Sequence, residues 1–150
     1  MSERPTVSIL HIEDDDVDRR AVKRAFRNIG VGNPAFEASD GAEALRLLRG
    51  ETGQVPEPRM VLLDLRMTGM NGHEFLDELR NDPNLRYTNV FVLTTSDNEV
   101  DRRQAHDKNV AGYLLKSNSN DEFMKNMKLI SDYLQQSCFP PGSTPAQSTS

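Results

Sequence analysis

Five short apolar runs, each followed by a longer amphipathic stretch, constrain the fold of this chain most strongly. The runs are of strand length and occupy residues 7–12, 35–38, 60–65, 90–94 and 111–115. The stretches between them carry apolar residues at helical spacing; the last has Phe123, Met127, Ile130 and Leu134. This alternation predicts an α/β fold, a (βα)5 doubly wound parallel sheet in strand order 2-1-3-4-5 with helices on both faces.

Helix starts are expected where a capping residue is followed by Glu three positions later. Four such pairs are present: Asp40 with Glu43, Asn71 with Glu74, Ser96 with Glu99, and Ser119 with Glu122. For the first helix we expect Asp16 to be the N-cap and Asp15 to be an exposed loop acid. The stretch 97–109 has only Val100 and Ala105 as apolar anchors, so it should form the loosest helix.

Length and charge limit the classes of function. The 150 residues fit one domain, expected over 1–138, and the Pro/Ser-rich stretch 139–150 is expected to be a disordered tail. Eighteen Lys and Arg against 23 Asp and Glu give a net charge of −5, so no basic face for nucleic acid is expected. Cys138 is the only cysteine and cannot form an internal disulfide. Without a signal-peptide pattern or an apolar run of membrane-spanning length, we expect a cytoplasmic protein without a membrane segment.

Polar residues gather where the expected strands end. Glu13 and Asp14 end the first strand, Asp64 lies near the end of the third, Thr94 ends the fourth, and Lys116 follows the fifth. Since ligands of such sheets bind beyond the carboxyl ends of the strands, the three carboxylates should share one crevice. Oxygen ligands without His or Cys favour a hard cation such as Mg²⁺. Together with an ammonium and a hydroxyl, they can stabilise a phosphoryl group in transfer, and a carboxylate can be the nucleophile.

The motifs around these residues resemble those of one known family. "HIEDDD", "VLLDLRMTGMNG", "VLTTS" and "YLLKS" appear in the order seen in the flavodoxin-like receiver domain of two-component response regulators. The resemblance covers residues 6–134. It implies that Asp64 is the phosphoacceptor and Asp14 a direct ligand of Mg²⁺ or Mn²⁺. Glu13 would hold the metal mostly through water, and the backbone carbonyl of Arg66 would be a further ligand.

The same resemblance assigns the remaining site residues. Lys116 would pair with the phosphoryl group, Thr94 would turn its hydroxyl onto it, and Tyr113 would be the aromatic switch that rotates inward. The donor would be a phosphohistidine on a sensor histidine kinase. Such a protein catalyses only its own phosphorylation and dephosphorylation, and it would signal through the face formed by helix 4, strand 5 and helix 5.

A narrower resemblance is to the stand-alone receivers paired with phytochrome-type histidine kinases. It rests on "LTTS", on "KS" in place of Lys-Pro, on the long connection 49–59, and on the aromatic-Pro-Pro sequence at 139–141. It implies a bacteriophytochrome as the kinase. It also implies a homodimer through helix 4, strand 5, helix 5 and the C-terminal extension.

Several positions depart from the usual receiver pattern. Thr68 stands where many receivers have proline, and Arg66 and Ser96 occupy positions that tune the lifetime of the phosphoryl group in the family. Ser117 follows the lysine where a cis proline is usual. We expect a trans bond there, because a cis bond before a non-proline residue costs about 2.5 to 4 kcal/mol.

Two other functions compete with the receiver assignment. One is a haloacid-dehalogenase-like phosphatase, because "DLRMT" resembles Asp-x-Asp-x-Thr; however, Arg66 replaces the second aspartate and that nucleophile is expected in the first strand. The other is an inactive receiver-like interaction module, disfavoured because every site position carries competent chemistry. His11, His73 and His106 lack ligand spacing, and we assign them no chemistry.

Overall fold

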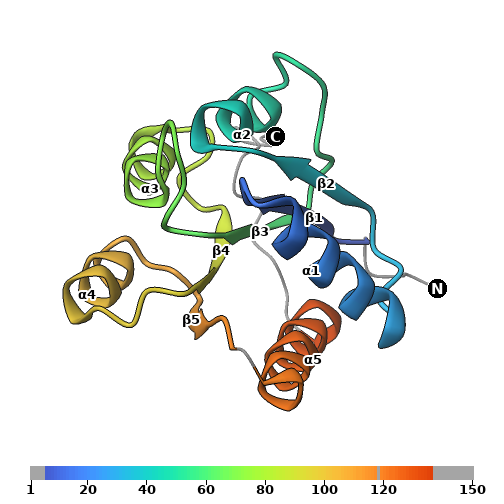
Figure 1. Cartoon of the computed structure of the whole chain (residues 1–150). Coiled ribbons are helices and arrows are strands. Elements are labelled where there is room, and N and C mark those ends of the chain that lie inside the picture. The colour runs from blue at the N-terminus through green and yellow to red at the C-terminus, as the bar shows by residue number, and fades with distance from the viewer. Residues whose placement is uncertain (1–5, 118, 137–150) are drawn as a thin grey trace.

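A single five-stranded parallel sheet forms the centre of the computed structural model, which describes residues 6–117 and 119–136. The strands are β1 (Ser8–Ile12), β2 (Ala35–Ala38), β3 (Arg59–Leu63), β4 (Asn89–Thr94) and β5 (Gly112–Leu115). Their order is β2-β1-β3-β4-β5, as the sequence predicts (Figure 1). In the register of the sheet, Leu10 of β1 lies opposite Phe36 of β2 and Val61 of β3.

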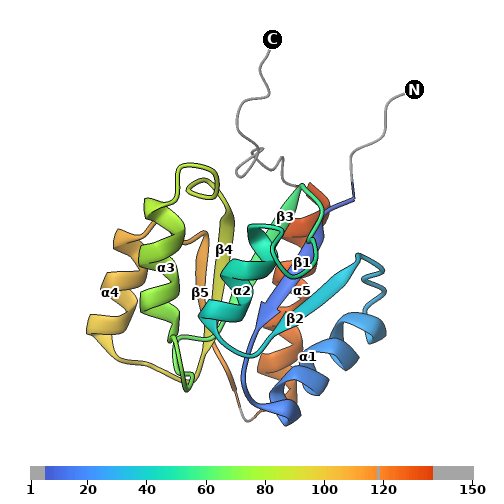
Figure 2. The same ribbon diagram turned by 90° about the horizontal axis from the view of Figure 1, so that it is seen from above.

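Helices cover both faces of the sheet. They are α1 (Asp16–Asn28), α2 (Gly41–Leu48), α3 (Gly72–Asn81), α4 (Glu99–Asp107) and α5 (Asn120–Gln136). The helices α1 and α5 lie on one face, and α2, α3 and α4 lie on the other (Figures 1 and 2). The expected (βα)5 architecture is therefore confirmed.

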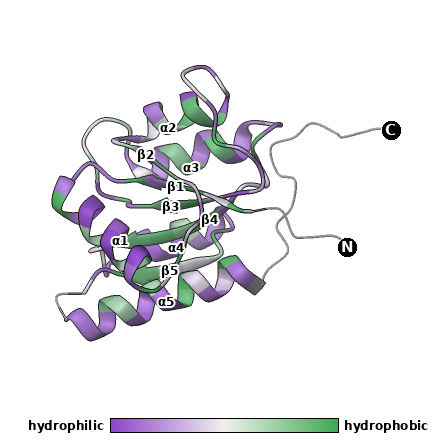
Figure 3. Ribbon diagram, turned by 90° about the vertical axis from the view of Figure 1, so that its right-hand side faces the viewer, coloured by the Kyte–Doolittle hydropathy of each residue, from purple (hydrophilic) through white to green (hydrophobic). Residues whose placement is uncertain are grey.

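Each face of the sheet has its own apolar core. In β3, Val61 and Leu63 pack with the residues of α2 and α3, while Met60 and Leu62 pack with those of α1 and α5. All four side chains are fully buried. Because both faces are covered, the central strands are mostly apolar rather than alternating, which Figure 3 shows as hydrophobic colour on the inner strands. The fold thereby leaves the carboxyl ends of the strands as the place for polar side chains.

Three of the expected helix caps are confirmed. The side chain of Asp40 accepts the N–H of Glu43, and Asn71 and Glu74 form a reciprocal capping box. Ser119 accepts the N–H of Glu122 at 3.4 Å.

Two expected caps are wrong. Asp15, not Asp16, caps α1: its Oδ1 accepts the N–H groups of Val17 at 2.8 Å and Asp18 at 3.1 Å. The first helical residue is Asp16, so its own backbone is already in the helix and its side chain pairs with Arg19 instead. Asn98, not Ser96, caps α4.

The helix α4 is weakly anchored, as expected, but by fewer residues than the sequence suggests. Ala105 is its one buried residue, whereas Val100 is 58% exposed. Residues five apart lie about 140° apart around a helix with 3.6 residues per turn, so Val100 and Ala105 cannot share one buried face.

Two details concern the ends of the strands. The strand β3 ends at Leu63, so Asp64 follows the strand instead of lying within it. In the described part of the chain, the cis peptide bond lies between Glu57 and Pro58; Lys116–Ser117 is therefore trans, as expected.

Across residues 6–117 and 119–136, no helix combines the length and hydropathy that crossing a membrane requires. The expected tail at 139–150 lies outside the described residues.

Candidate functional site

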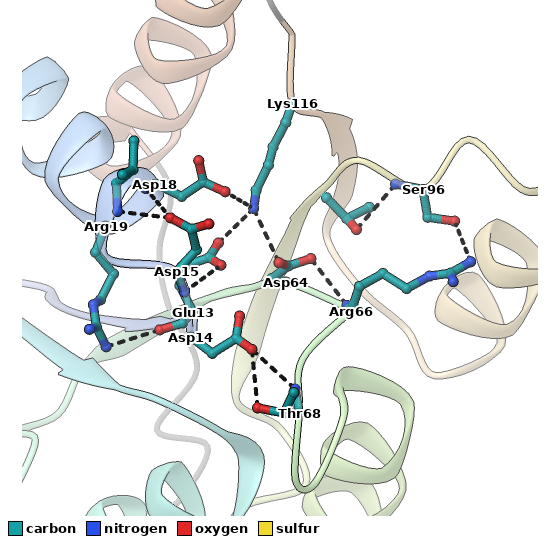
Figure 4. Close-up of polar contacts among 12 residues, drawn as sticks. Glu13, Asp14, Asp15, Asp18, Arg19, Asp64, Arg66, Thr68, Ser96 and Lys116 are labelled. Atoms are coloured by element: carbon teal, nitrogen blue, oxygen red, sulfur yellow. Dashed lines mark hydrogen bonds and ion pairs between the residues drawn. The ribbon is translucent and has the colours of Figure 1, made fainter.

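The polar residues singled out in the sequence meet at the carboxyl edge of the sheet. Glu13 follows β1, Asp64 follows β3, Thr94 ends β4 and Lys116 follows β5. Because the strands are parallel, these four positions come to one edge, where Figure 4 shows Lys116 reaching down between Glu13 and Asp64.

The ammonium of Lys116 is shared by three carboxylates. Its Nζ lies 2.6 Å from Glu13 Oε1, 2.7 Å from Asp18 Oδ2 and 3.1 Å from Asp64 Oδ2. Burial alone would lower the pKa of Lys116, but the hydrogen bonds to Asp18 and Glu13 and the charge of Asp64 raise it above its ordinary value. Lys116 therefore carries a fixed positive charge next to Asp64.

Three carboxylates converge closely enough to share a cation. One oxygen from each of Glu13, Asp14 and Asp64 lies within 4.8 Å of the others, and Glu13 and Asp64 are only 1% and 5% exposed. Burial, with a further contribution from the charge of Asp64, raises the pKa of Glu13 to about 7 against the opposing effect of Lys116. An all-oxygen set of this kind fits a hard divalent cation, which would relieve the repulsion among the three groups.

Thr68 holds the more exposed of these carboxylates. Its N–H and its Oγ1 both donate to Asp14 Oδ2, at 3.1 Å and 3.3 Å. A proline at this position has no N–H to donate, so the departure from the usual receiver sequence adds a hydrogen bond that fixes Asp14.

The loop after Asp64 is packed tightly against α3. The N–H of Arg66 donates to Asp64 Oδ1 at 3.2 Å, and the N–H of Gly72 donates to the carbonyl of Leu65 at 3.2 Å. A Cβ on Gly72 would lie 2.6 Å from the Cα of Leu65 and 2.8 Å from the carbonyl oxygen of Asp64, closer than real Cβ atoms approach. Only glycine therefore allows α3 to begin against this loop.

Thr94 and Tyr113 are connected through one loop residue. Thr94 is fully buried, and its Oγ1 accepts the N–H of Ser96 at 3.3 Å. The hydroxyl of Tyr113 donates to the carbonyl of Ser96 at 2.9 Å, with the guanidinium of Arg102 over its ring. Tyr113 is thus already half-buried and tied to the loop that follows Thr94; its inward rotation stays a prediction.

Sequence reasoning missed two acids of this region. Asp18 contacts Lys116 across 98 positions of the chain, and Asp101 accepts hydrogen bonds from Arg66, Ser96 and His73. Both partnerships depend on tertiary packing, and no local spacing marks either one.

Comparison with known proteins identifies the family. The model of the response regulator receiver domain matches residues 9–128. The chain belongs to the response regulator receiver family. Similar receivers include the probable methanogenesis regulatory protein FilR2 of Methanothrix harundinacea, 37% identical over 126 residues, which cover 83% of this chain and 81% of FilR2.

Two cyanobacterial receivers are also similar. Response regulator Rcp1 of Synechocystis is 32% identical over 131 residues, 86% of this chain and 89% of Rcp1. Its Mn²⁺-bound crystal structure has a TM-score of 0.80, with 30% identity, and covers 91% of this chain and 99% of that one. The structure of the phosphorylated cyanobacterial phytochrome response regulator RcpA has a TM-score of 0.81, 31% identity and the same coverage.

Proposed function

We propose that this receiver accepts a phosphoryl group on Asp64 from a phosphohistidine of a sensor histidine kinase, in a reaction that requires Mg²⁺ or Mn²⁺. The observation that carries the proposal is the position of Asp64: a buried carboxylate 3.1 Å from Lys116 Nζ that shares a cation-sized space with Glu13 and Asp14. Rcp1, a similar receiver, has been crystallised in an Mn²⁺-bound form, which supports the choice of metal.

The chemistry is an in-line phosphoryl transfer. A carboxylate oxygen of Asp64 forms the new O–P bond as the P–N bond to the donor histidine breaks, and the imidazole keeps the electron pair of that bond and takes up a proton. Lys116, already next to Asp64, pairs with a phosphoryl oxygen, and the buried hydroxyl of Thr94 donates to another. A divalent ion held by Glu13, Asp14, Asp64 and the carbonyl of Arg66 would neutralise the charge that develops on the phosphoryl oxygens.

The kinase is proposed to be a phytochrome-type histidine kinase. The support is the sequence resemblance together with Rcp1 and RcpA, the latter described as a phytochrome response regulator. FilR2, which is similar in sequence identity, is named for methanogenesis instead. The identity of the kinase is therefore tested by comparing the rates of phosphotransfer to this chain from a phytochrome-type kinase and from an unrelated histidine kinase. Faster transfer from the unrelated kinase would contradict this pairing.

The signalling face is proposed to lie on α4, β5 and α5. We propose that two copies of the chain form a homodimer through this face and the C-terminal extension. Val100, Leu115 and Leu129 on these elements are 58%, 36% and 48% exposed, which gives the face apolar contacts. Light scattering should give twice the mass of one chain at micromolar concentration, and Leu129→Glu should shift the mass toward one chain. A wild-type monomer would contradict the dimer. We also propose that the protein acts in the cytoplasm, as the partner of a cytoplasmic kinase domain, and that it binds no nucleic acid.

One assay separates the receiver from the phosphatase alternative. Incubation with a small acyl phosphate should add one phosphoryl group to the intact mass, only in the presence of Mg²⁺, and not to Asp64→Asn. Turnover of many acyl phosphates per chain without a lasting mass gain would favour the phosphatase. A mass gain that persists in Asp64→Asn would contradict the assignment of Asp64.

A further inference from the structure

Asp101, in the first turn of α4, contacts the loop before its own helix and two residues about 30 positions earlier in the chain, Arg66 and His73. Its Oδ2 accepts from Ser96 Oγ at 2.5 Å and from Arg66 Nη2 at 2.8 Å, and its Oδ1 lies 3.0 Å from His73 Nε2. Its side chain is only 15% exposed. These hydrogen bonds, led by that from Ser96, outweigh burial and lower the pKa of Asp101 to about 2.

This cluster is the main attachment of the N-terminal half of α4. Ala105 is the one buried residue of α4. The opposite end of the helix is fixed separately, because Arg80 Nε donates to the carbonyl of Lys108 at 2.7 Å and Lys108 Nζ pairs with Asp77 at 2.7 Å. Loss of the Asp101 contacts would therefore release one end of α4 and leave the other attached.

Two partners of Asp101, Arg66 and Ser96, also contact residues of the phosphoryl site; Figure 4 shows Arg66 between Asp64 and Ser96. Arg66 contacts Asp101 with its guanidinium and Asp64 Oδ1 with its backbone N–H. Ser96 contacts Asp101 with its hydroxyl and Thr94 Oγ1 with its backbone N–H. Asp101 thus touches the two residues that lie directly beside Asp64 and Thr94.

We propose that Asp101 is a positioning residue that couples helix α4 to phosphorylation at Asp64. In the unphosphorylated chain Asp101 holds the guanidinium of Arg66 on the α4 side of the loop. A phosphoryl group brings a charge of about −2 to Asp64 and offers Arg66 a competing anionic partner. When Arg66 turns to it, the N-terminal end of α4 loses a charged contact. This inference rests on the proposed function and names the residue through which that function reaches α4.

The expected effects follow from competition between Asp101 and the phosphoryl group for Arg66, because a guanidinium paired with the phosphoryl oxygens would shield them from attacking water. If phosphorylation weakens the Arg66–Asp101 contact, removing the charge of Asp101 frees Arg66 for the phosphoryl group and prolongs its lifetime. Asp101→Asn should lengthen the half-life of the phosphorylated chain by about fivefold, which corresponds to about 1 kcal/mol in the barrier to hydrolysis. Arg66→Ala combined with Asp101→Asn should have the half-life of Arg66→Ala alone, because Asp101 acts through Arg66.

The test follows intact mass after the acyl phosphate is removed, and amide hydrogen exchange of residues 98–108. Asp77→Asn is the matched control: it removes an acid that pairs with the other end of α4, and it should leave the half-life unchanged. In the wild type, phosphorylation should speed amide hydrogen exchange of residues 98–108. In Asp101→Asn, the same residues should exchange fast even in the unphosphorylated chain.

The outcomes are distinguishable. If the wild type takes no phosphoryl group, the proposed function and this inference both fail. If it is phosphorylated but Asp101→Asn keeps the wild-type half-life, or if the double variant differs from Arg66→Ala, the inference alone is overturned.

Discussion

The charge balance around Lys116 favours a cation at this site. Its ammonium contacts Glu13, Asp18 and Asp64, and Asp14 lies with two of these in the metal-sized space. One positive charge therefore faces four carboxylates. Like charges at about 4 Å repel by roughly 4 kcal/mol at a protein-like dielectric, so a divalent ion would remove a large part of this repulsion.

Neighbouring acids at the start of α1 have different roles: Asp15 caps the helix, whereas Asp16 is its first residue. Asp15→Ala removes the acceptor for the N–H groups of Val17 and Asp18 and should lower the free energy of unfolding by about 1 kcal/mol. Asp16→Ala is the matched control and should leave the free energy of unfolding nearly unchanged, because only an exposed pair with Arg19 is lost. Urea unfolding of both variants tests the assignment; an equal loss in both would contradict it.

Helix α4 should respond to acid through Asp101. The pKa of Asp101 falls from an ordinary 3.8 to about 2 in the folded chain, where Ser96, Arg66, His73 and Tyr113 surround it. Since the folded pKa is the lower one, the stabilisation is complete above about pH 4 and is lost as the pH falls toward 2.

Comparison of the wild type with Asp101→Asn isolates this effect. The wild type should be more stable by about 1 kcal/mol at pH 7, a value reduced for solvent screening, and the difference should shrink between pH 4 and 3. Urea unfolding at several pH values measures it. A difference that stays constant over this range would show that the charge of Asp101 contributes nothing.

The elements differ in how well the sequence predicts them. The inner strands β1, β3 and β4 follow from apolar runs, since strands buried on both faces are mostly apolar. The edge strands β2 and β5 are partly exposed, and their place in the sheet follows from the alternation of strands and helices instead. The caps at Asp40 and Asn71 follow from local spacing, because each acceptor lies three residues from its donor. Where several acceptors stand in a row, as at Asp15 and Asp16, local spacing fits more than one and the backbone conformation decides.

Contacts between distant elements are the part that local patterns miss. The polar residues at the strand ends could be found because parallel strands share a carboxyl edge. Asp18 and Asp101 lie on helices, and their partners depend on how α1 and α4 pack on the sheet. The same applies to His73, which has no ligand spacing but contacts Asp101.

For the whole molecule, binding of a cation should raise the stability of the folded chain against thermal unfolding. A ligand that binds only the folded chain stabilises it by about 2.7 kcal/mol at a hundred times its Kd. Mg²⁺ should therefore raise the melting temperature of the wild type and raise that of Asp64→Asn much less. Asp77→Asn, an acid outside the site, should respond as the wild type does. An equal Mg²⁺ effect in all three proteins would mean that the ion binds elsewhere.

The most direct test of the account is chemical mapping of the phosphorylated aspartate. After reaction with an acyl phosphate and Mg²⁺, borohydride reduces an aspartyl phosphate to homoserine, and tandem mass spectrometry of the peptides locates it. We expect homoserine in place of Asp64 and unchanged aspartate at positions 14 and 18. Homoserine at either of those positions, or reduction at none, would contradict the central role of Asp64.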